Sequence, residues 1–132
     1  MHNLRFFSII AWIAIPTVMY GGYALLGLLT RGGLSEFQQT YFRAGHAHAG
    51  VLLLMSLLYH YYMERTTLRP AIKVWAAAII LVGILAQSGG FFLHMALGQP
   101  GAPSLGTTIT SLGAVLLAAA VLILVYGLIT TR

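Results

Sequence analysis

The sequence contains four long apolar runs, and these constrain its fold more than any other feature. A helix needs about 20 apolar residues to cross the hydrocarbon core of a membrane. The runs have about this length or more, and they cover residues 6–30, 44–63, 71–97 and 107–130. They are too long for the strands of a membrane barrel and lack the alternation of such strands. The sequence therefore predicts an all-α, polytopic membrane protein with four transmembrane helices.

Composition excludes the main soluble alternatives. Of the 132 residues, 59% are hydrophobic and only 7% are charged, whereas soluble domains carry about 25% charged residues. The net charge of +5 comes from Lys and Arg residues spread singly along the chain, so it marks no nucleic-acid surface. The absence of Cys excludes disulfides and thiolate metal sites. The expected partner is the lipid bilayer and not nucleic acid.

The connections between the apolar runs are short, which predicts one up-down-up-down four-helix bundle over residues 1–132. The first run follows Arg5, as the apolar part of a signal peptide would. It is too long for that part and no clear cleavage site follows it, so we expect a retained helix. Ser35 and Gln38 have the spacing of a capping box. The second helix is therefore expected to begin near Glu36 and to project beyond the membrane.

The distribution of Lys and Arg predicts the orientation of the chain. One side of the membrane would carry five of these residues: Arg5, Arg65, Arg69, Lys73 and Arg132. The other side would carry only Arg31 and Arg43. The positive-inside rule then places both termini in the cytoplasm. In this orientation Tyr59, Tyr61 and Tyr62 are expected at the inner membrane interface, as an aromatic belt.

Histidines inside the spans are the informative polar residues, because ionisable groups in lipid are costly and usually face the bundle interior or water. His46 lies near the start of the second span and His94 near the end of the third. From the rise of a helix, both lie roughly 5 Å below the outer boundary. Adjacent helices joined by a short loop run antiparallel, so the two imidazoles are placed to meet.

Periodicity indicates which residues share a helix face. In the third span Gly83, Gln87, Gly90 and His94 form one small and polar stripe. In the second span a similar seam contains Glu36, Gln39, Arg43, His46, Gly50, Leu53, Leu57 and His60. Glycines beside the histidines allow a backbone or a flat ligand to approach closely. On the last helix, Thr107, Ser111, Ala114 and Ala118 are expected to form a close-packing seam.

The first hypothesis for function is a cofactor between the second and third helices near the outer face, with a role in electron transfer or sensing. A haem b would take His46 and His94 as axial ligands. Its further contacts would be Gly50, Gly90, Arg43 near the carboxylates and Gln87. A transition metal ion, Cu or Zn, would add His48 as a third ligand. However, His48 lies about 200° around a regular helix from His46, so only an irregular helix would aim both at one ion.

Two other hypotheses stay open. The histidines and amides of an accessory subunit would only hydrogen-bond between helices, at about 0.6 kcal/mol each. The partners of such a subunit would be further copies of the chain or a larger membrane complex. A transporter or proton pathway would use a line through His46, Gln87 and His60. No hydrolytic or transferase site is recognisable, because neither Glu36 nor Glu64 pairs with a nucleophile. Whether the protein is an enzyme of another kind stays open.

The segment Tyr-Phe-Arg-Ala-Gly-His-Ala-His-Ala-Gly-Val-Leu, residues 41–52, resembles a stretch of small bacterial four-span membrane proteins of no assigned function. The pattern Gly-Gly-Phe-Phe-Leu, residues 89–93, lies where that family has a Gly-Phe-Phe motif in its third span. The His-x-His sequence is also similar to helices of haem-copper oxidase relatives. The full set of haem-copper ligands is absent, so oxygen reduction is not implied. The resemblance implies a bacterial inner-membrane protein.

Overall fold

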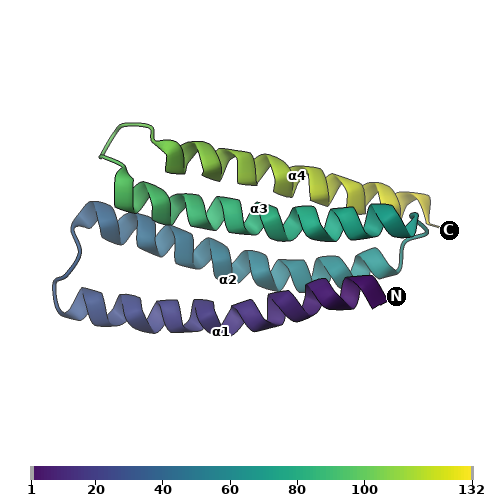
Figure 1. Cartoon of the computed structure of the whole chain (residues 1–132), viewed down its shortest axis with the longest axis horizontal. Coiled ribbons are helices and arrows are strands. Elements are labelled where there is room, and N and C mark those ends of the chain that lie inside the picture. The colour runs from purple at the N-terminus through teal and green to yellow at the C-terminus, as the bar shows by residue number, and fades with distance from the viewer. Residues whose placement is uncertain (1, 132) are drawn as a thin grey trace.

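The chain folds into four antiparallel helices with short connections, and Figure 1 shows the computed structural model. The structure describes residues 2–131, with side chains from Leu4 onward, so Arg132 and the side chain of His2 lie outside it. The helices are α1 (His2–Thr30), α2 (Glu36–Glu64), α3 (Pro70–Leu97) and α4 (Leu105–Thr130). All regular structure within residues 2–131 is helical, which confirms the prediction of an all-α fold.

Three of these helices are long and apolar enough to cross a membrane. They are α1 over Leu4–Thr30, α3 and α4. Large apolar side chains on their outer faces are widely exposed, including Leu85 at 74% and Ile129 at 77%. An isolated soluble protein does not expose apolar surface on this scale. The structure is therefore that of a multi-pass membrane protein, in which these side chains contact lipid.

Local sequence signals explain where the helices begin. Ser35 and Gln38 form the predicted capping box, because the Ser35 Oγ accepts from the Gln38 N–H at 3.3 Å and the Gln38 Oε1 accepts from the Ser35 N–H at 3.0 Å. This box starts α2 at Glu36, as predicted. Pro70 starts α3, where a missing N–H has no cost. Ser104 caps α4 by accepting from the backbone N–H of Thr107.

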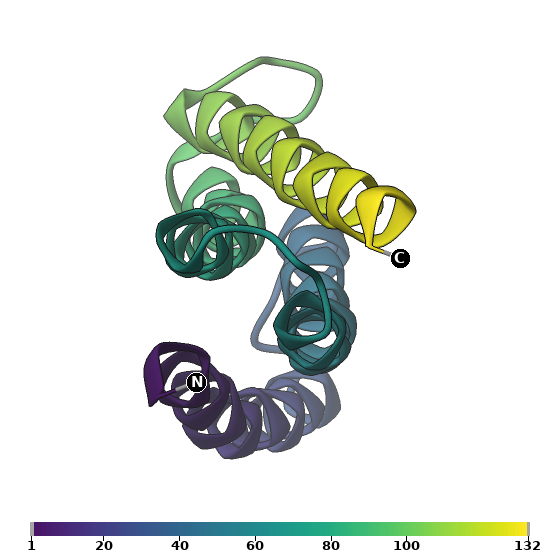
Figure 2. The same cartoon turned by 90° about the vertical axis from the view of Figure 1, so that its right-hand side faces the viewer.

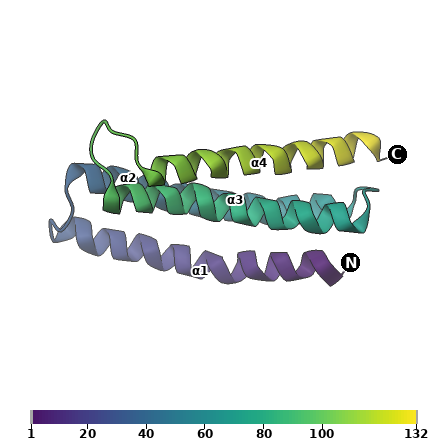
Figure 3. The same cartoon turned by 45° about the horizontal axis from the view of Figure 1, so that its top comes forward.

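The helices form an open arrangement instead of a closed square. Viewed end-on in Figure 2, α1 and α4 lie on opposite sides of the central pair α2 and α3. The contact between α3 and α4 is the most extensive, and α1 packs mainly on α2. Figure 3 shows the same separation of α1 from α4. The amino end of α1 and the carboxyl end of α4 lie at the same end of the molecule (Figure 1).

Glycines explain the close contact between α3 and α4. A Cβ added to Gly113 would overlap the backbone nitrogen of Gln87, and a Cβ added to Gly90 would overlap Thr110. The backbones of the two helices therefore meet directly, as small residues allow in membrane proteins. The Thr110 hydroxyl also donates to the Gln87 carbonyl at 3.2 Å. The polar stripe predicted on α3 is thus a packing surface, and its partner is α4.

The close-packing seam predicted on α4 is wrong. Ser111, Ala114 and Ala118 are exposed. The buried face of α4 instead consists of Gly106, Gly113, Leu117, Ala120 and Gly127. Both stripes have helical spacing, but only the second contains glycines that permit contact between backbones.

The expected tyrosine belt also needs a correction. Tyr59 is only 3% exposed, and its hydroxyl donates to the Ala120 carbonyl at 2.8 Å. It therefore connects α2 to α4, because a phenol buried in an apolar core requires a hydrogen-bond acceptor. Tyr61 and Tyr62, at 51% and 46% exposed, remain at the surface.

The contact between α3 and α4 gives the first testable prediction. Gly113→Ala is expected to lower the free energy of unfolding by about 1–3 kcal/mol, because the new methyl group overlaps the backbone of α3. Gly89→Ala is the matched control, since its Cβ would lie in open space. It should change stability little, or raise it by up to about 1 kcal/mol through helix propensity. Thermal unfolding in detergent measures both, and equal stability of the two variants would contradict the close contact.

Candidate functional site

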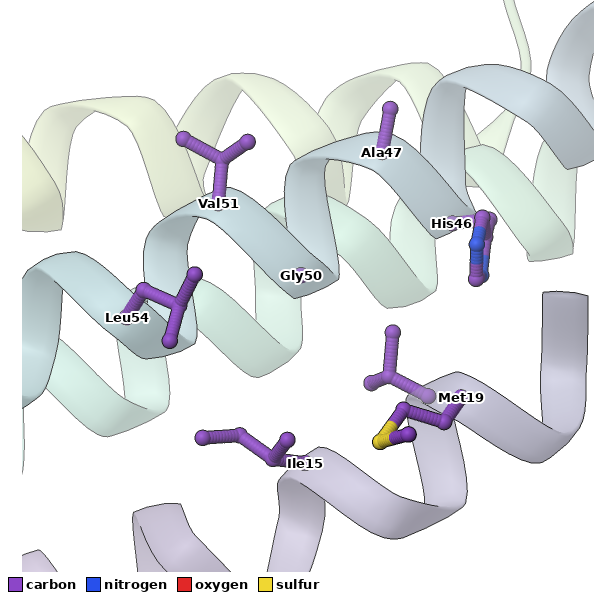
Figure 4. Close-up of a pocket in the computed structure, with 8 residues that line it drawn as sticks. Ile15, Met19, His46, Ala47, Gly50, Val51 and Leu54 are labelled. Carbon is purple, nitrogen blue, oxygen red and sulfur yellow. The ribbon is translucent and has the colours of Figure 1, made fainter.

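His46 faces α1 at one end of a groove between α1 and α2, as Figure 4 shows. The groove has a volume of about 350 Å³ and is lined by Ile15, Val18, Met19, Gly50 and Leu54 among others. The His46 ring packs on a pair of glycines, and a Cβ on Gly22 would lie only 3.0 Å from the ring Nε2. The absence of side chains at Gly21 and Gly22 therefore makes room for the imidazole.

His46 differs from the other histidines of α2 and α3 in its hydrogen bonding. His48, His60 and His94 each have a partner for Nδ1. Among the described residues, neither ring nitrogen of His46 has one. The ring is half-buried at one end of the groove, with its Nε2 nearest Gly22 and its Nδ1 nearest Gly21 of α1.

His94 is held in a structural contact where the carboxyl end of α3 lies beside the amino end of α4. It is 2% exposed, and its Nδ1 lies 2.7 Å from the Ser104 Oγ. The Ser104 oxygen already accepts from the N–H groups of Gly106 and Thr107, so its proton is donated to Nδ1. Tyr41 closes the site, with ring centroids 4.4 Å apart.

The structure does not bring His46 and His94 together. His46 and Gly50 face α1, whereas Gly90, Gln87 and His94 form the contact with α4. These residues therefore do not form the predicted haem-binding site between α2 and α3. Their matched depth follows from the rise of a helix, but the two rings point toward different neighbours.

The remaining candidates also lie apart. The Nδ1 of His48 donates to the Ala44 carbonyl at 2.7 Å, and its ring packs on Phe91 at 4.8 Å between centroids. Arg43 is exposed one turn before His46. Within residues 4–131, no group of three His, Cys, Asp or Glu side chains is placed to hold a metal ion. The proposed set of His46, His94 and His48 is accordingly not gathered.

His60 links α1 to α2 near the amino end of α1. It is 1% exposed, and its Nδ1 lies 3.3 Å from the Ser8 Oγ. Because the Ser8 hydroxyl proton is donated to the Leu4 carbonyl, His60 is the donor in this pair. Among the described residues no hydrogen bond joins Gln87 to His46 or His60, and its backbone carbonyl accepts from Thr110 of α4, so the line through His46, Gln87 and His60 stays a prediction.

Sequence reasoning missed three contributors to these sites. Met19 lines the groove of His46, and Gly21 and Gly22 make room for its ring. The Gly-Gly pair in an otherwise bulky apolar run was the available signal. Ser104 was not singled out from the sequence, because its contact with His94 depends on the packing of α4 on α3.

No protein-family model matches this sequence, and neither curated proteins nor solved structures give a match.

The contact between His94 and Ser104 gives the second prediction. Ser104→Ala is expected to lower the free energy of unfolding by about 1 kcal/mol through loss of the helix cap. His94→Ala should cost more because it also leaves a cavity beside Tyr41. A double-mutant cycle in detergent is expected to give a coupling of about 0.6 kcal/mol or more. Additive effects of the two substitutions would contradict the hydrogen bond.

Proposed function

We propose that all four helices cross the bacterial inner membrane and that both termini lie in the cytoplasm. Although α2 is less apolar, it has 29 residues and packs antiparallel against α1 and α3, which are both apolar enough to span. A helix of this length is about 43 Å long and exceeds the hydrocarbon thickness. The excess of Lys and Arg near the connection between α2 and α3 supports a cytoplasmic position for that connection.

Cysteine labelling tests this topology, because the natural chain has no Cys. Thr67→Cys lies in the connection between α2 and α3, and Ala102→Cys in the connection between α3 and α4; both positions are exposed. A membrane-impermeant maleimide is expected to label Ala102→Cys in intact spheroplasts and Thr67→Cys only after permeabilisation. The reverse pattern would contradict the orientation, and labelling of both positions in intact spheroplasts would contradict the spanning arrangement.

We propose further that the groove between α1 and α2 binds a haem b, with His46 as an iron ligand. The observation that carries this proposal is the unpartnered imidazole at the end of that groove. The groove of about 350 Å³ is open on one side, so a haem would lie partly in it and partly against lipid. Gly50 and the glycine pair of α1 keep bulky side chains away from His46.

The ligand inventory favours haem over a bare metal ion. A protein site for Zn needs three or four side-chain ligands, and the described residues gather no such set. The iron of haem already has four porphyrin nitrogens, so one histidine is sufficient. Met19 lines the same groove from α1 and offers a thioether, the second ligand found in cytochromes c. We expect Arg43, one turn from His46 and exposed, to pair with a haem carboxylate.

Electron transfer or ligand sensing is the chemistry that this arrangement suits. Haem held by one or two side chains changes oxidation state without needing an acid or base from the protein. The groove is apolar apart from His46 and the Met19 sulfur, so it supplies no group for hydrolysis or group transfer. The lipid-facing position also gives membrane-soluble molecules direct access to the groove.

Spectroscopy of haem-supplemented protein tests the site. The wild type is expected to show a Soret band that His46→Ala abolishes. His48→Ala and His94→Ala are matched controls that should keep the band, because their rings face Phe91 and Ser104 instead of the groove. A band that survives His46→Ala, or that also disappears in folded His48→Ala, would contradict the assignment.

A second candidate is a structural subunit that carries no cofactor. The hydrogen bonds His94–Ser104 and His60–Ser8 favour it, because each links two helices and uses an imidazole for structure alone. A stable, colourless wild type that binds no added haem, together with intact folding of His46→Ala, would favour this candidate over haem binding.

A further inference from the structure

A second groove lies between α1 and α3, on the side of α1 away from the groove of His46, and residues of α2 also line it. It has a volume of about 510 Å³, and its walls are apolar side chains that include Phe7, Ala14, Leu85 and Phe92. Val18 lines both this groove and that of His46, so the two sites are separated by little more than one side chain. Because α1 and α3 are both apolar enough to span, the groove lies within the membrane.

Thr17 and Ser88 carry the two hydroxyls that line this groove, and the Thr17 hydroxyl already donates to the Ala14 carbonyl at 2.6 Å. Ser88 is only 5% exposed, and its Oγ has no hydrogen-bond partner among the described residues. Hydroxyls in helices commonly donate to the carbonyl four residues earlier, as Ser8 and Ser111 do in this protein. Buried polar groups in proteins are nearly always paired, so an unpaired hydroxyl beside a cavity indicates a missing acceptor.

We propose that this groove binds an isoprenoid quinone, with a ring carbonyl accepting a hydrogen bond from the Ser88 hydroxyl. The carbonyl supplies the missing acceptor. Phe92 offers an aromatic face to the flat ring, and Gly89 leaves space beside it, since a Cβ there would contact nothing within 4 Å. The apolar walls that continue to Phe7 suit a hydrocarbon tail.

The depth of Ser88 distinguishes a quinone from a phospholipid. Ser88 lies about 14 Å from the carboxyl end of α3 and about 27 Å from its amino end. This position is inside the hydrocarbon core of about 30 Å. The ester groups of a phospholipid lie at the interface and its chains carry no acceptor, whereas a quinone ring is soluble in the core and carries two carbonyls.

Titration of the purified protein in nanodiscs with a decyl-tailed benzoquinone tests the proposal. Gly89→Leu is expected to abolish binding because its side chain fills the groove. Its control is Gly27→Leu, whose Cβ also meets open space but lies outside the groove. Ser88→Ala should weaken binding about tenfold through loss of one hydrogen bond. Ser111→Ala, on the exposed face of α4, should leave it unchanged.

Decylbenzene has the ring and the decyl tail but no carbonyl, so it tests how much the carbonyl contributes to binding. It is expected to bind at least tenfold more weakly than the quinone, and equally to wild type and Ser88→Ala. Equal affinity for both compounds would overturn the proposal and assign the groove to hydrocarbon chains. Quinone binding unaffected by Gly89→Leu would overturn the location. His46→Ala should bind the quinone normally, so this result and the loss of haem are distinguishable.

Discussion

The direct contact between the backbones of α3 and α4 determines how the other side chains are arranged. Lipid chains are as apolar as the helix surfaces, so helices in a membrane associate through close packing and hydrogen bonds. The glycines of α3 and α4 provide both, because they expose the backbone and allow Thr110 to reach the Gln87 carbonyl. This contact uses the polar stripe of α3, including His94. The faces of α3 that contact α2 and α1 are mostly apolar.

Packing density then decreases across the molecule from α4 to α1. Glycines bring the backbones of α3 and α4 into contact, and the hydrogen bond from Tyr59 to the Ala120 carbonyl joins α2 to α4. By contrast, α1 packs mainly on α2, and grooves of about 350 and 510 Å³ lie on its two sides. The histidine on the dense side has Ser104 as a hydrogen-bond partner. The histidine on the loose side has none, and this difference locates the candidate ligand site.

Much of the fold follows from the sequence, but the neighbours of each helix face do not. Apolar length predicts the helices, and Ser35 with Gln38 predicts the start of α2. Helical periodicity correctly groups Gly83, Gln87, Gly90 and His94 on one face, and His46 with Gly50 on another. Periodicity gives the angle between residues of one helix and contains no information about the rotation of that helix relative to its neighbours. To predict whether His46 and His94 meet, one would need to know that rotation.

Small residues on α4 illustrate the same limit. Alanines and glycines occur on several faces of α4, so a stripe of small residues identifies no unique contact. The choice between Ala114 and Gly113 depends on whether the partner helix approaches to backbone distance, which only the structure shows. Tyr59 shows the same limit. A tyrosine near a helix end can lie at the membrane interface, or it can be buried and donate to a carbonyl, and the sequence does not distinguish these positions. The acceptor of Tyr59, the Ala120 carbonyl, is 61 residues away in the sequence.

The two ends of α1 are attached to α2 in different ways. Near its amino end, Ser8 and His60 form the one side-chain hydrogen bond between α1 and α2 in the described residues. Near its carboxyl end, His46 packs on Gly21 and Gly22 without a hydrogen bond. Displacing the carboxyl end of α1 therefore breaks only van der Waals contacts, whereas displacing the amino end also leaves a buried imidazole unpaired. The fold thus holds the amino end of α1 against α2 more firmly than the part of α1 on which His46 packs.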